Sequence, residues 1–154
     1  MKVFPNVSEL KASIGLGVGE SDWFVVTQDQ VDHFASITRD EQFIHINPEQ
    51  AQLTSFGGTI AHGFLSLSML SYFAQSGCGV SVEGAKVFIN YGFDKVRFLN
   101  PVRVGSKIRA HSKLLSVEEK CLGQILTTLQ ISVEIEGMEK PALFADWLIL
   151  IDRN

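Results

Sequence analysis

An acid and a histidine stand five residues apart in the segment TRDEQFIHINP, which spans residues 38–48. They are Asp40 and His45, and the apolar Phe43 and Ile44 lie between them. A histidine can take a proton from water near neutral pH, and a nearby carboxylate can hold the other side of that water. Apolar neighbours provide a low-dielectric setting that pushes the two pKa values apart. The segment therefore suits a cleft in which two titratable side chains act on one water molecule.

Each of the two residues also has a purely structural interpretation. Asp40 alone could be a turn or cap residue behind a helix, which is the commoner use of such an acid. His45 alone, among apolar residues, could be a hydrogen-bonded histidine of the core. The tripeptide Ala61-His62-Gly63 opens a later helix and favours the catalytic interpretation, because its backbone could complete such a site.

Two short helices are predicted on either side of the pair. Residues 27–30 form a capping-box pattern, and apolar residues then recur at helical spacing until about residue 38. An Asn-Pro pair at residues 47–48 begins the second helix, with proline at the first helical position. Residues five apart on one helix would point about 140° away from each other. The connection between two helices can instead fold Asp40 and His45 toward each other.

A longer helix is predicted over residues 63–75, with apolar residues on nearly every side. Such a helix is typically buried on all sides, and Gly77 provides its C-terminal stop. Gly63, at its N-terminus, has a backbone N–H without an intrahelical partner and lies at the positive end of the helix dipole. One such donor can stabilise a developing oxyanion by about 3 kcal/mol, and glycine lets a carbonyl approach closely. Gly63 is therefore suited to hold the carbonyl oxygen of a substrate.

The second half of the chain is predicted to form four long β-strands. Segments 86–98, 102–116, 122–136 and 141–151 are rich in branched and aromatic residues, with turn residues between them. A buried helix followed by an antiparallel sheet predicts an α+β fold in which the sheet wraps around the helix. No repeat, linker or low-complexity tract interrupts residues 1–154, so a single domain is expected.

The composition argues against several classes of protein. The net charge is −4 and the basic residues are scattered, so no nucleic-acid partner is expected. The longest apolar run, near residues 64–74, carries three serines and is too short to span a bilayer, so no membrane partner is expected. Cys78 and Cys121 lack metal-ligand spacing and are expected to be reduced thiols of a cytoplasmic protein. No metal or cofactor is implied, and eleven phenylalanines indicate a large buried surface or a subunit interface.

Three segments carry a resemblance to a known family: SITRDEQFIHINPEQA, GGTIAHGFLSLSML and INYGFDKVRFLNPVRVGS. They resemble the MaoC-like dehydratase family, hot-dog domains that include R-specific enoyl-CoA hydratases, and look closest to its nodulation protein N-like branch. The resemblance covers roughly residues 15–150 and implies an overhanging helical segment before the central helix. Asp40 and His45 match the family's catalytic pair. Gln42-Phe43 stands where typical R-specific hydratases have Asn-Pro.

The resemblance also implies roles for further residues. His62 and Gly63 match the His-Gly that opens the family's central helix, and Ser68 matches a serine six residues after that histidine. We therefore expect substrate contacts from Gly63, Ser68, Gln42 and His62. Alternatives stay open for three of them. His62 could fix the turn into the helix, Ser68 could bond back to its own helix, and Gln42 could bond the loop backbone.

The implied reaction is the reversible hydration of a trans-2-enoyl-CoA, or of an acyl-carrier thioester, to the R-3-hydroxyacyl thioester. Asp40 and His45 would activate the water, and the Gly63 N–H would hold the thioester carbonyl. A hot-dog thioesterase and a non-catalytic acyl-thioester binding or assembly subunit are the alternatives. A homodimer is expected, since hot-dog domains generally pair into one continuous sheet. Four cations could meet substrate phosphates or be solvated strand charges: Lys86, Lys95, Arg97 and Arg103.

Overall fold

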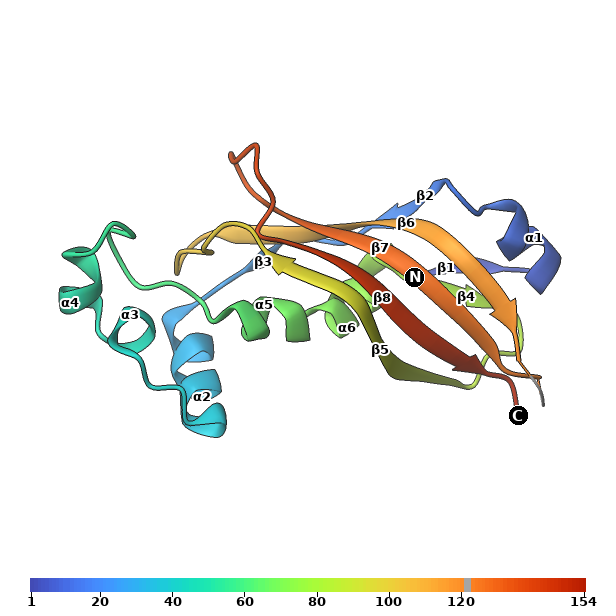
Figure 1. Ribbon diagram of the computed structural model, residues 1–154, viewed down its shortest axis with the longest axis horizontal. Coiled ribbons are helices and arrows are strands. Elements are labelled where there is room, and N and C mark those ends of the chain that lie inside the picture. Colours follow the sequence, from blue (N-terminus) through green and yellow to red (C-terminus); the bar gives the residue numbers. More distant parts are fainter. Residues whose placement is uncertain (121–122) are drawn as a thin grey trace.

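A six-stranded antiparallel sheet dominates the computed structural model, which describes residues 1–120 and 123–154 (Figure 1). Its order is β2-β6-β7-β8-β5, and the short β3 also pairs with β6. The strands are β2 Gly17–Glu20, β3 Phe24–Val25, β5 Val87–Phe98, β6 Lys107–Glu119, β7 Ile125–Ile135 and β8 Leu143–Asp152. The four long strands overlap the four segments predicted from the sequence. The predicted start of the third segment, residue 122, lies outside the described residues.

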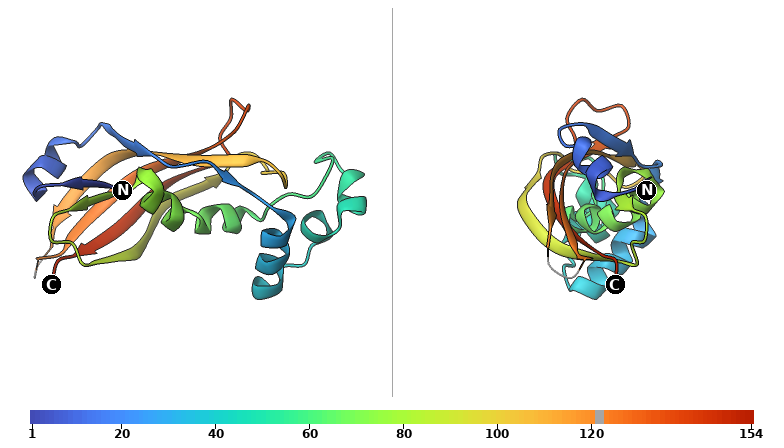
Figure 2. Two further views of the ribbon diagram at one scale, coloured as in Figure 1. Left: turned by 180° about the vertical axis from the view of Figure 1, so that it is seen from behind. Right: turned by 90° about the vertical axis from the view of Figure 1, so that its right-hand side faces the viewer.

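Alternating side chains give this sheet one buried face. Every second residue of β7 and β8 is buried, as Ile131, Val133, Ala145 and Trp147 illustrate. The two-residue period of a strand places these side chains on the same face. The end-on view in Figure 2 shows the sheet curling around a helical segment on that side. This is the arrangement of a sheet around a helix that the sequence predicted.

The enclosed helical segment consists of short pieces rather than one long helix. They are α5 Gly63–Ser68, α6 Leu70–Phe73 and the π-helical turn η1 Ala74–Cys78. Met69, with φ −68° and ψ −11°, separates α5 from α6. Leu70 and Phe73 are buried in the core, but Phe64 is 66% exposed, so the prediction of burial on every side is wrong. The described part of the chain covers only one side of the segment.

Three further helices form a segment that extends beyond one end of the sheet (Figure 1). They are α2 Gln28–Thr38, α3 Phe43–Ile46 and α4 Pro48–Gln52. Thr27 caps α2 with both hydrogen bonds of the predicted capping box. Asn47 accepts a hydrogen bond from the Gln50 N–H and so caps α4. This is the overhanging helical segment, and it precedes the central helical segment as expected.

The N-terminal residues close the core at the opposite end of the sheet (Figure 1). Strand β1 Lys2–Phe4 pairs in parallel with β4 Val80–Val82, and α1 Val7–Ala12 follows β1. Leu10 of α1 is fully buried and joins the main hydrophobic core. The buried residues of α1, Val7 and Leu10, therefore pack one side of this helix on the core.

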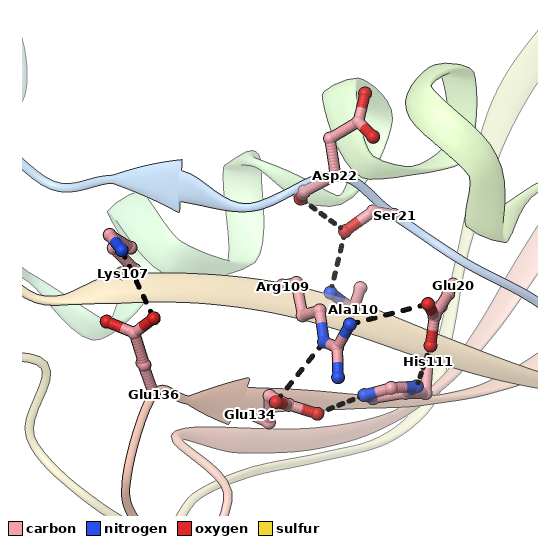
Figure 3. A network of polar contacts seen from close by, with 9 residues as sticks. All are labelled: Glu20, Ser21, Asp22, Lys107, Arg109, Ala110, His111, Glu134 and Glu136. Atoms are coloured by element: carbon pink, nitrogen blue, oxygen red, sulfur yellow. Dashed lines mark hydrogen bonds and ion pairs between the residues drawn. The ribbon is translucent and has the colours of Figure 1, made fainter.

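A charged network cross-links β2, β6 and β7 on the outer face of the sheet (Figure 3). Arg109 forms ion pairs with Glu20 at 3.3 Å and with Glu134 at 3.2 Å. His111 lies between the same two carboxylates. Burial raises the pKa of Glu134, but the neighbouring His111 and Arg109 outweigh it and hold that pKa below its usual range. Arg109 and His111 alternate with buried residues of β6, so His111 lies on the surface of the sheet.

Two facing glycines allow the backbones of η1 and β2 to lie directly against each other. A Cβ on Gly77 would lie 2.0 Å from the carbonyl oxygen of Glu20, and a Cβ on Gly19 would lie 2.3 Å from that of Gly77. Backbone atoms cannot swing aside as a side chain can. Gly77→Ala is therefore expected to lower the free energy of unfolding by at least about 2 kcal/mol, measured by chemical denaturation. Gly17→Ala on β2 is the control, because its nearest new neighbour would be 3.9 Å away. Equal stability of the two variants would contradict the close approach.

No helix among residues 1–120 and 123–154 is long and apolar enough to span a membrane.

Cys78 is buried and forms no disulfide with a described residue, and burial raises the pKa of its thiol to about 12. The thiol therefore stays protonated and poorly reactive at neutral pH. Cys121 lies outside the described residues.

Candidate active site

The turn between α2 and α3 carries Asp40. Arg39 ends α2 in the left-handed conformation, with φ 63° and ψ 19°, and this turns the chain at the next residue. Gln42 is the N-cap of α3, whose single turn carries His45. The sequence predicted both residues in a connection between helices, whereas His45 lies on a one-turn helix within it. A helix of four residues is too short to show a periodic pattern.

His45 is 6% exposed, and its ring is fixed in one tautomer. Nδ1 lies 2.7 Å from the carbonyl oxygen of Ile60, and because a carbonyl only accepts, Nδ1 carries the proton. Nε2 is therefore an unprotonated acceptor. Burial lowers the pKa of His45 and the neighbouring His62 lowers it further, against the Ile60 hydrogen bond and Asp40, which raise it. His45 is neutral at pH 7 and can accept a proton through Nε2.

Asp40 presents its carboxylate beside the two histidines. Its side chain is 57% exposed, and one carboxylate oxygen lies 4.0 Å from His62 Nε2. One ligand atom each from Asp40, His45 and His62 lies within 4.8 Å of the other two. Two atoms that each form a hydrogen bond of about 2.8 Å to the same water oxygen lie about this far apart. The spacing therefore suits a single water held between the carboxylate and the ring of His45.

His62 ties the two candidate residues to the start of α5. Its ring stacks on that of His45, with centroids 3.7 Å apart and an interplanar angle of 24°, and Phe34 packs 5.1 Å away. Its Nε2 donates to the backbone carbonyl of Asp40 at 2.9 Å. Nδ1 is buried without a partner among the described residues. The structural alternative for His62 is therefore present, and its contact with substrate stays a prediction.

Gln28 fixes the backbone of His45, a role that the sequence did not indicate. Its Nε2 donates to the carbonyl of His45 at 2.7 Å, and Thr59 Oγ1 donates to its Oε1 at 2.5 Å. These partners lie 17 and 31 residues away in the chain, so no local pattern could reveal them. The bonds join α2, α3 and the segment that returns to α5.

His45 and Gly63 line the same pocket, which has a volume of about 340 Å³. Phe64 and Phe98 supply part of its apolar wall, with ring centroids 5.5 Å apart. Gly63 lies so close to Phe98 that a Cβ on it would come within 2.9 Å of the ring. As the first residue of α5, Gly63 has a backbone N–H without an intrahelical acceptor. The pocket thus combines a basic ring nitrogen with a helix N-terminus.

The structure does not bring Ser68 to this pocket. Its exposed hydroxyl donates to the Phe64 carbonyl at 2.7 Å, which is the bond back to its own helix that the sequence left open. Ser66 is buried and lines the pocket of His45 instead. It follows Gly63 by three residues and so lies on the same side of the helix. That spacing was the available signal for Ser66.

Gln42 acts in the structure through its backbone. The His45 N–H donates to the Gln42 carbonyl at 2.9 Å, whereas the exposed Gln42 side chain makes no hydrogen bond with a described residue. The expected contact between this side chain and a substrate stays a prediction.

Asp40, His45 and His62 are close enough together to be considered as ligands of a cation. The near-parallel stacking of the two rings argues against one ion bound by both. Imidazole lone pairs lie in the ring planes, so an ion between stacked rings would lie outside both planes. One ring would have to leave its hydrogen bond to a backbone carbonyl. The arrangement suits a water molecule better.

Known proteins share this fold and much of this sequence. The family model described as MaoC like domain matches residues 9–136. The chain is 44% identical over 149 residues to 3-hydroxyacyl-thioester dehydratase Z of Mycobacterium tuberculosis, covering 97% of each protein. It is 42% identical over 147 residues to nodulation protein N of Rhizobium leguminosarum bv. viciae, covering 95% of this chain and 91% of that protein.

A solved structure, the MaoC-like dehydratase from Rhodospirillum rubrum, superposes with a TM-score of 0.74. Its sequence identity is 19%, over 92% of this chain and 93% of that chain, so it supports the fold alone. The curved sheet, the central helical segment and the overhanging helical segment together form a hot-dog fold. The chain belongs to the MaoC-like dehydratase family and is an enzyme of the hydratase/dehydratase class.

Proposed function

We propose that this protein reversibly hydrates the trans double bond of a 2-enoyl thioester and forms the R-3-hydroxyacyl thioester. One observation supports the proposal: a neutral histidine shares a pocket with a helix N-terminus and has a carboxylate close to its ring. His45 and Gly63 line the same pocket, and Asp40 lies within 4.8 Å of the His45 ring. The name of the M. tuberculosis relative, 3-hydroxyacyl-thioester dehydratase, agrees with an acyl-thioester substrate.

In the proposed reaction, a water held between Asp40 and His45 attacks C3 of the enoyl group. His45 Nε2 accepts a proton from this water while the new C–O bond forms, and the carboxylate of Asp40 orients the water and stabilises the imidazolium. The electrons of the double bond move to the thioester oxygen as an enolate. The proton held by the pair then passes to C2, which restores both residues. The reverse sequence of steps is dehydration.

The Gly63 N–H is proposed to stabilise the enolate oxygen. It combines an unpaired donor with the positive end of a helix, and it is already oriented before the reaction begins. A Cβ on Gly63 would displace the Phe98 ring, which forms part of the wall of this pocket. Ser66 adds a polar group to the wall of the same pocket.

We further propose that two copies of the chain pair through β5. This strand lies at the edge of the sheet and pairs only with β8 among the described residues. Phe88, Phe93 and Phe98 face the core side, opposite buried residues of β8, yet they remain exposed. A second copy placed at this edge would cover them together with Phe64 and extend the sheet. Multi-angle light scattering should give twice the chain mass of 17.0 kDa, and a monomer at micromolar concentration would contradict the pairing.

The proposed reaction can be tested with crotonyl-CoA, by following the absorbance of the conjugated enoyl thioester. Wild-type protein should remove this absorbance without releasing free thiol, and Asp40→Asn should not. Release of thiol would support the thioesterase alternative. Tight CoA binding without turnover of short and medium chains would support a non-catalytic binding subunit. We also propose that the protein is located in the cytoplasm.

The pH profile of hydration should reflect the environment of His45. Protonation of Nε2 removes the acceptor for the water proton, and burial lowers the pKa at which this happens. The value of kcat/KM is therefore expected to be level near pH 8 and to fall to half its maximum only below about pH 6.5, the ordinary histidine pKa. Initial rates in buffers of constant ionic strength measure the profile. Half-loss of activity above pH 6.5 that is not caused by unfolding would contradict the assignment.

A further inference from the structure

Ser66 carries a buried hydroxyl that has no hydrogen-bond partner among the described residues. The residue is 4% exposed, and its Oγ neither donates to nor accepts from the described part of the chain. Six serines and threonines of residues 1–120 and 123–154 are buried, and the hydroxyls of the other five all donate hydrogen bonds: Ser21, Thr59, Ser81, Ser112 and Thr127. Burying a polar group without a partner is destabilising, so this exception indicates a partner outside the chain.

The helix offers this hydroxyl a hydrogen bond that it does not make. A helical serine or threonine can donate to the carbonyl four residues earlier, as Ser68 and Thr38 do in this protein. Ser66 would find that acceptor at His62, but the His62 carbonyl receives the backbone N–H of Ser66 instead, at 3.3 Å. The hydroxyl of Ser66 is therefore turned away from the backbone of its own helix.

The pocket of His45 is the place where this hydroxyl can meet a ligand. Ser66 lines the pocket together with His45 and Gly63, and α5 lies at the end of the central helical segment that is nearest the overhang (Figure 1). The Ser66 oxygen is not sealed from solvent, unlike the unpaired Nδ1 of His62. A helical side chain leans toward the preceding turn, where Gly63 has no side chain to cover it. The hydroxyl therefore opens into the pocket on the side of the Gly63 N–H.

The other side chains of the pocket wall leave Ser66 as its unpaired donor. Among the described residues of the lining, only His45 and Asn100 add further polar side chains. His45 presents Nε2, which is an acceptor, and the amide nitrogen of Asn100 is held by a hydrogen bond to the Lys140 carbonyl at 2.9 Å. The hydroxyl of Ser66 thus suits an acceptor oxygen of a ligand that is otherwise surrounded by apolar side chains.

We propose that the Ser66 hydroxyl donates a hydrogen bond to the thioester carbonyl oxygen of the substrate, beside the Gly63 N–H. The inference rests on the proposed function and adds a second catalytic donor to it. The carbonyl oxygen gains negative charge as the enolate forms, so a donor that is already in place stabilises the transition state more than the bound substrate. In the free protein the hydroxyl lacks a partner because its acceptor belongs to the substrate.

Ser66→Ala separates this catalytic role from a structural one, because activity and stability should respond differently. With crotonyl-CoA, kcat should fall about 100-fold while KM changes less than about threefold, since the hydrogen bond strengthens as charge develops. The unfolding temperature should equal or exceed that of wild type, because no hydrogen bond within the protein is lost. A hydroxyl with a structural role would lower the unfolding temperature as well.

Two further variants control for volume and for the type of substitution. Ser66→Cys keeps the side chain nearly the same size but offers only a weak S–H donor, so it should be about as slow as Ser66→Ala. Ser76→Ala removes a hydroxyl of η1 that bonds the Phe73 carbonyl at 3.2 Å and lies outside the pocket. This control should keep wild-type kcat. Wild-type kcat in Ser66→Cys together with a loss in Ser66→Ala would show that residue 66 acts by packing.

The substrate carbonyl itself reports the proposed hydrogen bond. Butyryl-CoA carries the thioester without the double bond, so it can bind but cannot be hydrated. Infrared difference spectra with an isotope label at the carbonyl carbon give the stretching frequency of the bound group. Hydrogen bonds weaken the C=O bond, so this frequency should be lower in wild type than in Ser66→Ala. Equal frequencies would show that the hydroxyl does not contact the carbonyl.

The outcomes distinguish failure of this inference from failure of the proposed function. Wild-type kcat in Ser66→Ala would overturn the inference and leave hydration established, as would equal carbonyl frequencies in the two proteins. Wild-type inactivity on crotonyl-CoA would count against the proposed function. The infrared experiment would still test the hydrogen bond in that case, because it requires binding and not turnover. Absence of a bound carbonyl signal at saturating butyryl-CoA would count against both.

Discussion

Asp40→Asn and His45→Gln are each expected to lower kcat for hydration of an enoyl thioester by about 100- to 10,000-fold. Asparagine keeps the size of Asp40 but loses the charge that orients the water and stabilises a protonated His45. Glutamine at position 45 offers no nitrogen lone pair to accept a proton. Because Asp40 is exposed and His45 lies in a partly apolar pocket, only His45→Gln should also cost some stability. Initial rates at saturating substrate measure the effect.

Two neighbouring residues of the overhanging segment provide matched controls. Glu41→Gln changes an exposed acid next to Asp40, and His33→Gln changes an exposed histidine on α2. Neither lines the pocket of His45, so both variants should keep wild-type kcat. If the two controls lost as much activity as Asp40→Asn and His45→Gln, the overhang would act through its fold rather than through the pair. Thermal unfolding of each variant must accompany the rates.

Gly63→Pro should lower kcat by about 100- to 1000-fold relative to Gly63→Ala. Proline deletes the backbone N–H that is proposed to bind the enolate oxygen. It is otherwise compatible with the first position of a helix, and His62, with φ −59° and ψ 138°, has the extended conformation that a residue before proline adopts. Alanine adds the same Cβ beside the Phe98 ring but keeps the N–H. The pair of variants therefore separates crowding from the loss of one hydrogen-bond donor.

Gly63→Ala is itself expected to lose some activity, since its Cβ would force the Phe98 ring to move. Because the obstacle is a side-chain ring and not backbone, it can shift, so this loss should be much smaller than that of the proline variant. Equal activity of Gly63→Pro and Gly63→Ala, with both folded, would show that the N–H of residue 63 does not bind the oxyanion.

The sequence predicted the architecture because its signals are local. The capping box at Thr27 and the Asn-Pro pair before α4 lie within a few residues of what they define, and both are present in the structure. Branched and aromatic residues likewise marked the segments that form the four long strands. The placement of Asp40 and His45 near each other followed from these boundaries together with the family resemblance. That residues 1–154 form a single domain stays a prediction.

Features that depend on distant contacts did not follow from the sequence. An apolar stretch can indicate burial, but it does not reveal that part of the buried surface belongs to a subunit interface, as proposed for Phe64. The break at Met69 has no glycine or proline to mark it. Ser68 matched the family pattern, yet Ser66 lies in the pocket, because helix orientation is set by packing against the sheet. Gln28 and His62 hold the site through partners at least 17 residues away.

The claim that Asp40 and His45 act together on one water can be tested most directly with the double variant Asp40→Asn/His45→Gln. Residues that act as a unit give strongly non-additive losses. If the two residues act together, kcat of the double variant should lie within a few-fold of kcat of the less active single variant. Losses that multiply, so that the double variant falls by the product of the two single effects, would show independent roles and contradict the proposed pair.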